Sequence, residues 1–429
     1  MHILKIIHGY PPGYSAGSEV YSQSLCQELH RQGHRLTIFS REEEPYRPDF
    51  ELRSFKDEQG LEFHLVNMPR DKDGYWQPQV DQKLAAILAQ DRPDVAHIGH
   101  LNHLSLGLVQ ALKKAGVPIL FTLHDFWLMC PRGQFLQRNF DGQNCYQLCT
   151  GQEDQKCAQS CYKMLFSGHP EEEAEDLAYW SRWIGRRMQK TREIIGLVDH
   201  FIAPSRYLMN RFIHDFNLPA EKVSYLDYGF PTHYLSPPKT ARKAGPFRFG
   251  YIGTHIPAKG VNLLIEAFKG LAQGAELKIW GWKDSQSQKA LSAMSAAQSQ
   301  RISFCGGYAN EDLVQEVFAQ VDAIVVPSIW GENSPLVIHE AQAARLPVIT
   351  ADYGGMAEYV AHGVNGLLFK HRDGPSLQEQ MAWAIQHPEE MKQLGQRGYL
   401  YDAAGEVPDI KTHTATILEQ YKAILHVQA

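Results

Sequence analysis

The chain has 429 residues, of which 44% are hydrophobic and 21% are charged, and its formal net charge is −6. This is ordinary globular composition, but the length exceeds what one hydrophobic core supports, so we expect two domains. The negative charge argues against a general nucleic-acid binder, and no apolar run is long enough to span a membrane.

The first half of the chain alternates predicted strands and helices. Short apolar, β-branched runs predict strands at 2–8, 34–40, 61–68, 94–100, 118–124, 200–205 and 222–229. Helical spacing of apolar residues predicts helices at 18–32, 79–90 and 104–115. This β–α alternation predicts a parallel, doubly wound sheet within an N-terminal domain of residues 1–235.

An insertion at residues 127–195 interrupts the alternation. It contains an acidic run and a long predicted helix near 175–196, which carries Trp180 and Trp183 beside basic residues that include Arg187. We interpret this helix as having one packed face and one solvated basic face. The alternative is that the basic face contacts a substrate that accepts a transferred group, or an anionic membrane surface.

The same insertion holds an unusual cysteine cluster. Cys130 is followed by two pairs with equal spacing, Cys145 with Cys149 and Cys157 with Cys161. Whether these cysteines form disulfides depends on the compartment. The first apolar run of the chain, at 2–8, is too short for a signal peptide, so we expect a cytoplasmic protein, with peripheral contact at the inner membrane face as an option. Because a reducing compartment disfavours disulfides, the two pairs suggest a structural zinc site. Packed reduced thiols, or disulfides formed after purification, are the alternatives, and Cys26 and Cys305 are expected to be buried in apolar segments.

The second half of the chain repeats the alternation. A segment rich in Pro, Lys and Ala predicts a linker at 236–246, followed by a second domain at 247–405. Strands are predicted there at 247–254, 276–282, 302–306, 323–328, 347–352 and 366–369. The last segment, 406–429, predicts a helix with an apolar stripe.

Residues 323–360 are the most informative segment. They predict a buried strand, a loop, a helix, a second strand and a turn at Gly354-Gly355. Ser334 is the expected N-cap and Pro335 the first helical residue, which leaves the N–H groups of Leu336 and Val337 as a site for a phosphate. Glu332 lies in the loop before this helix, and Glu340 lies one turn past Leu336, so the phosphate site has a carboxylate on either side.

This segment resembles the signature of the retaining glycosyltransferases of family GT4, through Glu332-x7-Glu340 within PS…GENSPLVIHEA…PVIT…GG. The resemblance implies a GT-B fold: two Rossmann-like α/β domains facing a cleft, with the last helix crossing back to the first domain. It implies transfer of a hexose from a UDP- or GDP-sugar to a glycan, lipid-linked or small-molecule acceptor with retention of anomeric configuration.

The resemblance also implies the site residues. His124, Lys259 and Glu332 are the expected catalytic residues, and Lys259 is expected to meet the donor diphosphate. The donor site is expected to comprise Gly17, Gly253, Thr254, Lys259, Glu332, Asn333, Ser334, Leu336, Val337 and Glu340. The acceptor side is expected to comprise Tyr14, Asn102, His103, His124 and Asp125.

Several points stay open in the sequence. No DxD-like motif stands where it would hold Mg²⁺, so no cofactor is expected for catalysis, and the zinc suggested at the cysteine cluster would be structural. A catalytically inactive nucleotide-sugar-binding protein and a GT-B sugar-nucleotide epimerase are the rival functions. The sugar, base, acceptor, pathway and oligomeric state are not encoded in any pattern that we can interpret.

Overall fold

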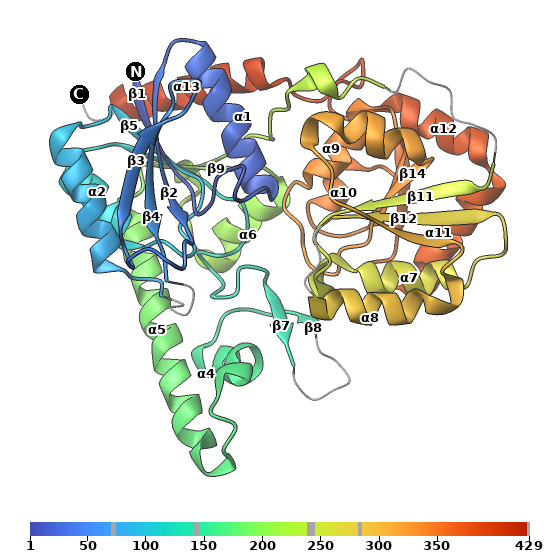
Figure 1. The fold of residues 1–429 in the computed structure, drawn as a ribbon, viewed down its shortest axis with the longest axis horizontal. Coiled ribbons are helices and arrows are strands. Elements are labelled where there is room, and N and C mark those ends of the chain that lie inside the picture. The colour runs from blue at the N-terminus through green and yellow to red at the C-terminus, as the bar shows by residue number, and fades with distance from the viewer. Residues whose placement is uncertain (70–73, 140–145, 238–244, 282–284, 427–429) are drawn as a thin grey trace. The chain divides into compact units, whose positions relative to one another are not determined.

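The computed structural model describes residues 1–69, 74–139, 146–237, 245–281 and 285–426 (Figure 1). The chain divides into two compact units. Unit 1 comprises residues 1–229 and 410–429, and unit 2 comprises residues 230–409. The chain therefore passes between units near 229 and 409, whereas the sequence analysis placed the domain boundaries at 235 and 405. The predicted linker, 236–246, falls largely outside the described residues.

Unit 1 is built on an eight-stranded sheet in the order β10-β9-β6-β5-β1-β2-β4-β3. Its strands are β1 (His2–Ile6), β2 (Arg35–Glu42), β3 (Leu52–Lys56), β4 (Glu62–Asn67), β5 (Val95–Ile98), β6 (Ile119–Thr122), β9 (His200–Ala203) and β10 (Val223–Tyr225). All neighbouring pairs are parallel except β3 with β4. The parallel sheet confirms the predicted fold class, and β3 is an antiparallel edge strand that the sequence analysis missed.

Helices connect these parallel strands. They are α1 (Gly17–Arg31), α2 (Pro78–Gln90), α3 (Gly107–Lys114), α5 (Glu173–Leu197) and α6 (Arg206–Phe216). The central strands β1, β5 and β6 are almost completely buried, as expected for a parallel sheet covered on both faces.

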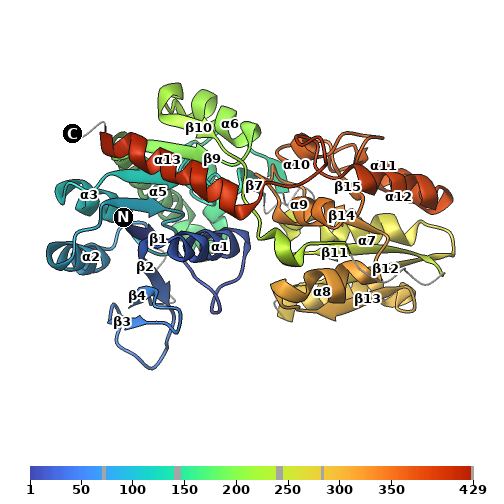
Figure 2. The ribbon, with the colours of Figure 1, turned by 90° about the horizontal axis from the view of Figure 1, so that it is seen from above.

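The last helix, α13 (Ile410–His426), belongs to unit 1 and runs beside α1 (Figure 2). Its apolar stripe is buried, and two polar contacts fix its position. Tyr21 of α1 hydrogen-bonds His413 at 2.8 Å, and His97 of β5 hydrogen-bonds Tyr421 at 2.7 Å. The return of the last helix to the first domain, which the resemblance implied, is therefore confirmed.

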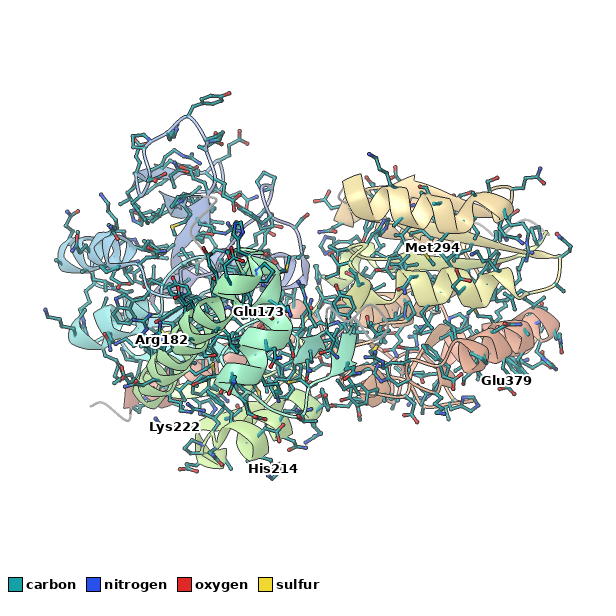
Figure 3. All side chains as sticks on the ribbon, turned by 90° about the horizontal axis from the view of Figure 1, so that it is seen from below. Glu173, Arg182, His214, Lys222, Met294 and Glu379 are labelled. Atoms are coloured by element: carbon teal, nitrogen blue, oxygen red, sulfur yellow. The ribbon has the colours of Figure 1, made fainter. Side chains whose placement is uncertain are left out.

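The insertion forms a small subdomain of unit 1. It contains the hairpin β7 (Leu136–Arg138) and β8 (Tyr146–Leu148), then α4 (Asp154–Cys157), a π-helical turn (Ala158–Tyr162) and the long helix α5, whose residues Glu173 and Arg182 are labelled in Figure 3. Arg187 does not lie on a solvated face as expected. It is 1% exposed, donates to the Trp127 carbonyl oxygen at 2.5 Å, and lies over the Trp127 ring.

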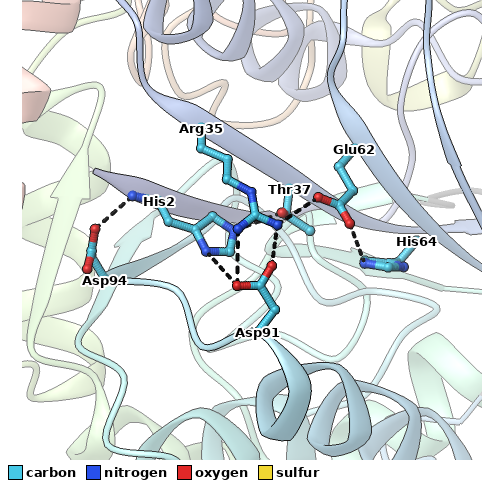
Figure 4. Close-up of polar contacts among 7 residues, drawn as sticks. All are labelled: His2, Arg35, Thr37, Glu62, His64, Asp91 and Asp94. Carbon is cyan, nitrogen blue, oxygen red and sulfur yellow. Dashed lines mark hydrogen bonds and ion pairs between the residues drawn. The ribbon is translucent and has the colours of Figure 1, made fainter.

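A charged network caps the amino ends of the strands in unit 1 (Figure 4). Arg35 of β2 pairs with Asp91, and with Glu62 of β4 at 3.0 Å. The backbone N–H of His2 donates to Asp94 at 2.7 Å. Ligands of doubly wound sheets bind at the opposite, carboxyl ends of the strands, so this network is a structural feature.

Unit 2 is built on a six-stranded parallel sheet in the order β13-β12-β11-β14-β15-β16. Its strands are β11 (Phe247–Ile252), β12 (Ala275–Trp280), β13 (Ile302–Gly306), β14 (Ala323–Val326), β15 (Val348–Ala351) and β16 (Gly366–Phe369). Its helices are α7 (Val261–Lys269), α8 (Ser285–Ser295), α9 (Leu336–Ala343), α10 (Met356–Tyr359), α11 (Gly374–Gln386) and α12 (Pro388–Arg397). Cys305 is exposed rather than buried, because β13 is an edge strand.

Candidate functional site

The start of helix α9 lies at the carboxyl end of β14, as predicted, with a shift of one residue at its cap. The helix begins at Leu336 and its N-cap is Pro335, not Ser334. Ile338 is the first residue whose N–H bonds back, to the Pro335 carbonyl oxygen at 3.0 Å. The N–H groups of Leu336 and Val337 therefore belong to the first turn, which has no intrahelical acceptor and carries the positive end of the helix dipole.

Lys259 and Glu332 form an ion pair at the same edge of the sheet. Lys259 follows β11, and its Nζ donates to Glu332 Oε1 at 2.7 Å. Ser328 donates to the same carboxylate oxygen at 2.5 Å. The Glu332 side chain is 7% exposed and that of Lys259 is 30% exposed. The pair therefore places Lys259, the residue expected to meet the donor diphosphate, in contact with Glu332, the first glutamate of the signature.

Three glycines let the loops around this pair approach each other closely. A Cβ on Gly355 would lie 1.3 Å from the Asn333 carbonyl oxygen, and one on Gly260 would lie 2.0 Å from the Pro327 carbonyl oxygen. Gly354 has a φ of 64°, which glycine adopts without strain. The N–H of Gly355 also donates to the Glu332 carbonyl oxygen at 2.8 Å. The double-glycine turn therefore clamps the loop that carries Glu332, Asn333 and Ser334, all of which are buried.

Glu340 lies half-buried on α9, one turn beyond the helix start. Burial raises the pKa of its carboxyl to about 7, and neighbouring His339 partly opposes the shift. Within the described part of the chain, no hydrogen bond or ion pair ends on its carboxylate. The structure thus places Glu340 as predicted, with a carboxylate that can accept hydrogen bonds from a ligand.

The remaining donor-side residues lie around the end of β11. Gly253 adopts a φ of 149°, and the Thr254 carbonyl oxygen accepts a hydrogen bond from the Tyr251 hydroxyl at 2.8 Å. Thr254 is exposed, whereas His255 is buried near the Trp280 carbonyl oxygen. In unit 1, Gly17 is the first residue of α1 and directly follows the N-cap, Ala16.

The acceptor-side residues all follow three adjacent strands of unit 1. Tyr14 lies in the loop after β1, Asn102 and His103 follow β5, and His124 and Asp125 follow β6. Because β6, β5 and β1 are neighbours and parallel, these loops meet at one edge of the sheet.

His124 is held in one orientation. Its Nδ1 hydrogen-bonds the Tyr228 hydroxyl at 2.5 Å, and the two rings stack. Burial lowers the pKa of His124 well below its ordinary value, and the charge of buried Lys5 adds to the effect. His124 is therefore a neutral imidazole near pH 7, which can accept or donate a hydrogen bond but carries no charge.

Three residues that the sequence analysis did not single out join this edge. His8 Nε2 lies 3.2 Å from Glu19 Oε1, and the His8 ring packs against His100. His100 Nε2 in turn lies 3.3 Å from Asp125 Oδ1. Both histidines are next to a glycine at the end of a strand, as His8-Gly9 and as Gly99-His100. This pairing is the signal that could have identified them.

The cysteine cluster is only partly described. Cys145 lies outside the described residues, so the predicted set of Cys145, Cys149, Cys157 and Cys161 is not tested. Cys130, Cys149, Cys157 and Cys161 line one small cavity. Burial raises the pKa of Cys130 to about 11 and that of Cys157 to about 12, with the neighbouring thiols as smaller causes. As the described side chains stand, no group of three or more His, Cys, Asp or Glu residues is arranged to hold a metal ion.

The family described as Glycosyltransferase Family 4 matches residues 15–233, which is more than half of the chain. The family described as Glycosyl transferases group 1 matches residues 235–401. The protein belongs to glycosyltransferase family 4. The recognition made from the residue 323–360 signature is confirmed.

Curated relatives match this family 4 chain over part of their length. D-inositol 3-phosphate glycosyltransferase of Nocardia farcinica is 26% identical over 57% of this chain and 56% of its own. A GDP-mannose-dependent phosphatidylinositol monomannoside mannosyltransferase of Mycobacterium tuberculosis is 26% identical over 49% of this chain and 57% of its own. The chain thus spans only about half the length of these relatives.

Solved structures confirm the GT-B fold. Anabaena HepE in complex with UDP and glucose has a TM-score of 0.68 at 18% identity, with 99% of this chain and all of that one covered. Sucrose-phosphate synthase of Thermosynechococcus elongatus has a TM-score of 0.73 at 17% identity, with 99% of each chain covered. Among the described helices of the family 4 chain, none is long and apolar enough to cross a membrane.

Proposed function

We propose that this protein transfers a sugar from a nucleoside diphosphate sugar to a hydroxyl acceptor, with retention of anomeric configuration and without a catalytic metal. The observation that carries this proposal is the geometry of unit 2. The start of α9, the Lys259–Glu332 pair and Glu340 lie together at the carboxyl edge of one parallel sheet. Membership of family 4 supports the reaction class.

The α9 start and Lys259 are assigned to the donor diphosphate. The first-turn N–H groups of Leu336 and Val337 donate to phosphate oxygens, and Lys259 supplies a full positive charge. Glu340 accepts hydrogen bonds from the two ribose hydroxyls. HepE, whose solved complexes contain UDP and UDP-glucose, is consistent with a nucleotide-sugar donor.

The chemical step breaks the bond between the sugar C1 and the departing phosphate oxygen. The acceptor oxygen forms its bond to C1 on the same face, and its proton passes to the departing diphosphate. Negative charge on that diphosphate grows as the bond breaks, so Lys259 and the α9 N–H groups stabilise the transition state more than the ground state. Glu332 holds Lys259 in position. Its carboxylate also contacts the transferred sugar, on the side of the phosphate site opposite to Glu340.

Unit 1 is assigned to the acceptor, which is a glycan, a lipid-linked sugar or a small molecule. Neutral His124, held by Tyr228, and Asp125 with His100 offer donors and acceptors for hydroxyl groups. A cytoplasmic location with peripheral membrane contact, and a role in polysaccharide assembly, complete the proposal.

The test is a panel of UDP-, GDP- and ADP-sugars, assayed for release of the nucleoside diphosphate and for change of the sugar itself. Release that is accelerated by a hydroxyl acceptor supports transfer. A changed sugar that remains on its nucleotide would identify an epimerase instead. Tight binding with no turnover of any donor, whichever acceptor is added, would identify an inactive binding protein.

Nucleotide binding should depend on pH through Glu340. The ligand-free carboxyl has a raised pKa of about 7, and the ionised form is the better acceptor for ribose hydroxyls, so affinity should rise as pH rises through 7. Between pH 8 and pH 6 the affinity for a nucleoside diphosphate should fall about tenfold, as the ionised fraction does. Calorimetric titration measures this. Glu340→Gln gives the baseline set by the phosphate's own ionisation, and an equal pH slope in that variant would contradict the assignment.

Turnover should not need a divalent cation at the donor site. A brief incubation with excess EDTA should leave the rate at saturating acceptor unchanged, because Lys259 and the α9 N–H groups neutralise the leaving group. The rate and the thermal unfolding temperature are measured on the same sample. Activity that disappears with EDTA and returns with Mg²⁺ or Mn²⁺, at an unchanged unfolding temperature, would refute metal independence.

A further inference from the structure

A single cavity in the insertion subdomain collects thiols from three separate stretches of chain. Cys130 lies on the turn after Phe126, Cys149 follows β8, Cys157 ends α4, and Cys161 lies in the π-helical turn directly after it. The cavity measures about 10 Å³, which is room for one water-sized guest. Its remaining described lining is Pro131, Arg132, Phe135, Leu136, Gln152 and Tyr162. Among these residues there is neither a carboxylate nor an imidazole.

The side chain of a half-buried arginine lines the same space. Arg132 lines the cavity, and its Nε–H is buried and finds no acceptor among the described residues. Leaving a buried N–H donor without an acceptor costs free energy. A cavity lined by uncharged thiols in fixed positions therefore does not account for the Arg132 Nε–H. Thiolate sulfur would accept this hydrogen bond, and the cation would offset part of a negative charge in the cavity.

We propose that Cys130, Cys149, Cys157 and Cys161 bind one zinc ion as a structural tetrathiolate site. Four sulfur ligands around a space for a single atom are the chemistry that zinc prefers, and Cys130 is the fourth cysteine among the described lining residues. The four thiol protons leave to solvent, and Arg132 donates to one of the resulting thiolates. This proposal is independent of the donor chemistry assigned to unit 2.

The four thiols must turn toward the cavity to reach the ion, because they do not stand at coordinating positions in the structure. Cys149 has the most freedom to do so. It is only half-buried, and its Sγ–H is directed to the Gly151 carbonyl oxygen at 3.1 Å. Its backbone is already tied to the Cys130 turn, since its N–H donates to the Phe135 carbonyl oxygen at 3.1 Å.

Zinc at this position would brace the loop that leads from the acceptor-side residues. Cys130 donates its N–H to the Phe126 carbonyl oxygen at 2.7 Å, and Trp127 donates its own to Asp125 at 2.7 Å. Asp125 is therefore one short turn away from the first proposed ligand. Loss of the ion should raise the KM for the acceptor and leave nucleoside diphosphate binding in unit 2 unchanged.

The first test uses the native protein. Elemental analysis after purification under reducing conditions should give about one zinc per chain. Alkylation followed by peptide mass mapping should then label Cys130, Cys149, Cys157 and Cys161 only after a chelator has removed the ion. Protein that contains no metal, and whose four thiols are alkylated without a chelator, overturns the proposal. One iron in place of zinc, or two disulfides, does so as well.

Variants decide which cysteine is the fourth ligand. Cys130→Ser should lose zinc, whereas Cys145→Ser should keep it, as should Cys305→Ser on the exposed edge strand of unit 2. Zinc that survives Cys130→Ser and is lost in Cys145→Ser overturns the ligand set. Should Cys130→Ser fail to fold, the alkylation pattern of the native protein still distinguishes Cys130 from Cys145.

Discussion

Replacing Lys259 with Ala should lower kcat/KM by about two orders of magnitude or more, because a donor aimed at developing negative charge is typically worth that much. Most of the loss should appear in kcat, since the leaving-group charge grows only in the transition state. Steady-state assays with the best donor of the nucleotide-sugar panel measure the effect.

The matched control is Lys269→Ala. Lys269 lies on α7 of the same unit and pairs with Glu266 at 2.8 Å near the surface, so its loss removes one solvent-accessible ion pair. Because Lys259→Ala also leaves the buried Glu332 carboxylate with Ser328 alone, both variants should be compared at a temperature well below unfolding. Turnover near wild type in Lys259→Ala would mean that Lys259 only supports the loop around Glu332.

Gly355→Ala should abolish nucleotide binding and destabilise unit 2. The new Cβ would lie 1.3 Å from the Asn333 carbonyl oxygen, a backbone atom that cannot move without displacing Glu332 and Ser334. Overpacking of this kind costs about 3 kcal/mol or more. Denaturant unfolding and calorimetric titration with a nucleoside diphosphate read the two effects separately.

Gly245→Ala is the matched control for this change. Gly245 also lies in unit 2, and a Cβ added there would meet no atom of the described residues within 4 Å. It should leave stability and binding close to wild type. If Gly355→Ala unfolds and binds like Gly245→Ala, the double-glycine turn does not clamp the loop that carries Glu332, Asn333 and Ser334.

The positions of the residues proposed for the donor site on α9 could be predicted from the sequence because their order is local. Pro335 fixes where α9 can begin, and the 3.6-residue repeat then places Glu340 one turn after the free N–H groups. Only the cap differed, by one residue, since the ψ of 115° at Pro335 is extended instead of helical. The contact between Lys259 and Glu332, 73 residues apart, depends on how β11 and β14 pair, and no local pattern encodes that.

The insertion was harder to predict for the same reason. Helical periodicity found α5, but residue type alone assigned Arg187 to solvent, because its acceptor, the Trp127 carbonyl, lies 60 residues away. The polar edge strand β3 carries no apolar alternation, so it was missed. Equal spacing drew attention to Cys145, which lies outside the described residues, and no spacing pattern indicated that the fold also brings the more distant Cys130 to the cavity.

The most direct test of the account is calorimetric titration of UDP and GDP into the wild-type protein and into Glu340→Gln. We expect one diphosphate to bind at one site per chain, and we expect Glu340→Gln to weaken it about 10- to 100-fold, the worth of a charge-assisted hydrogen bond. Equal affinity in the two proteins, or no binding of either nucleotide at millimolar concentration, would contradict the assignment of unit 2 to the donor.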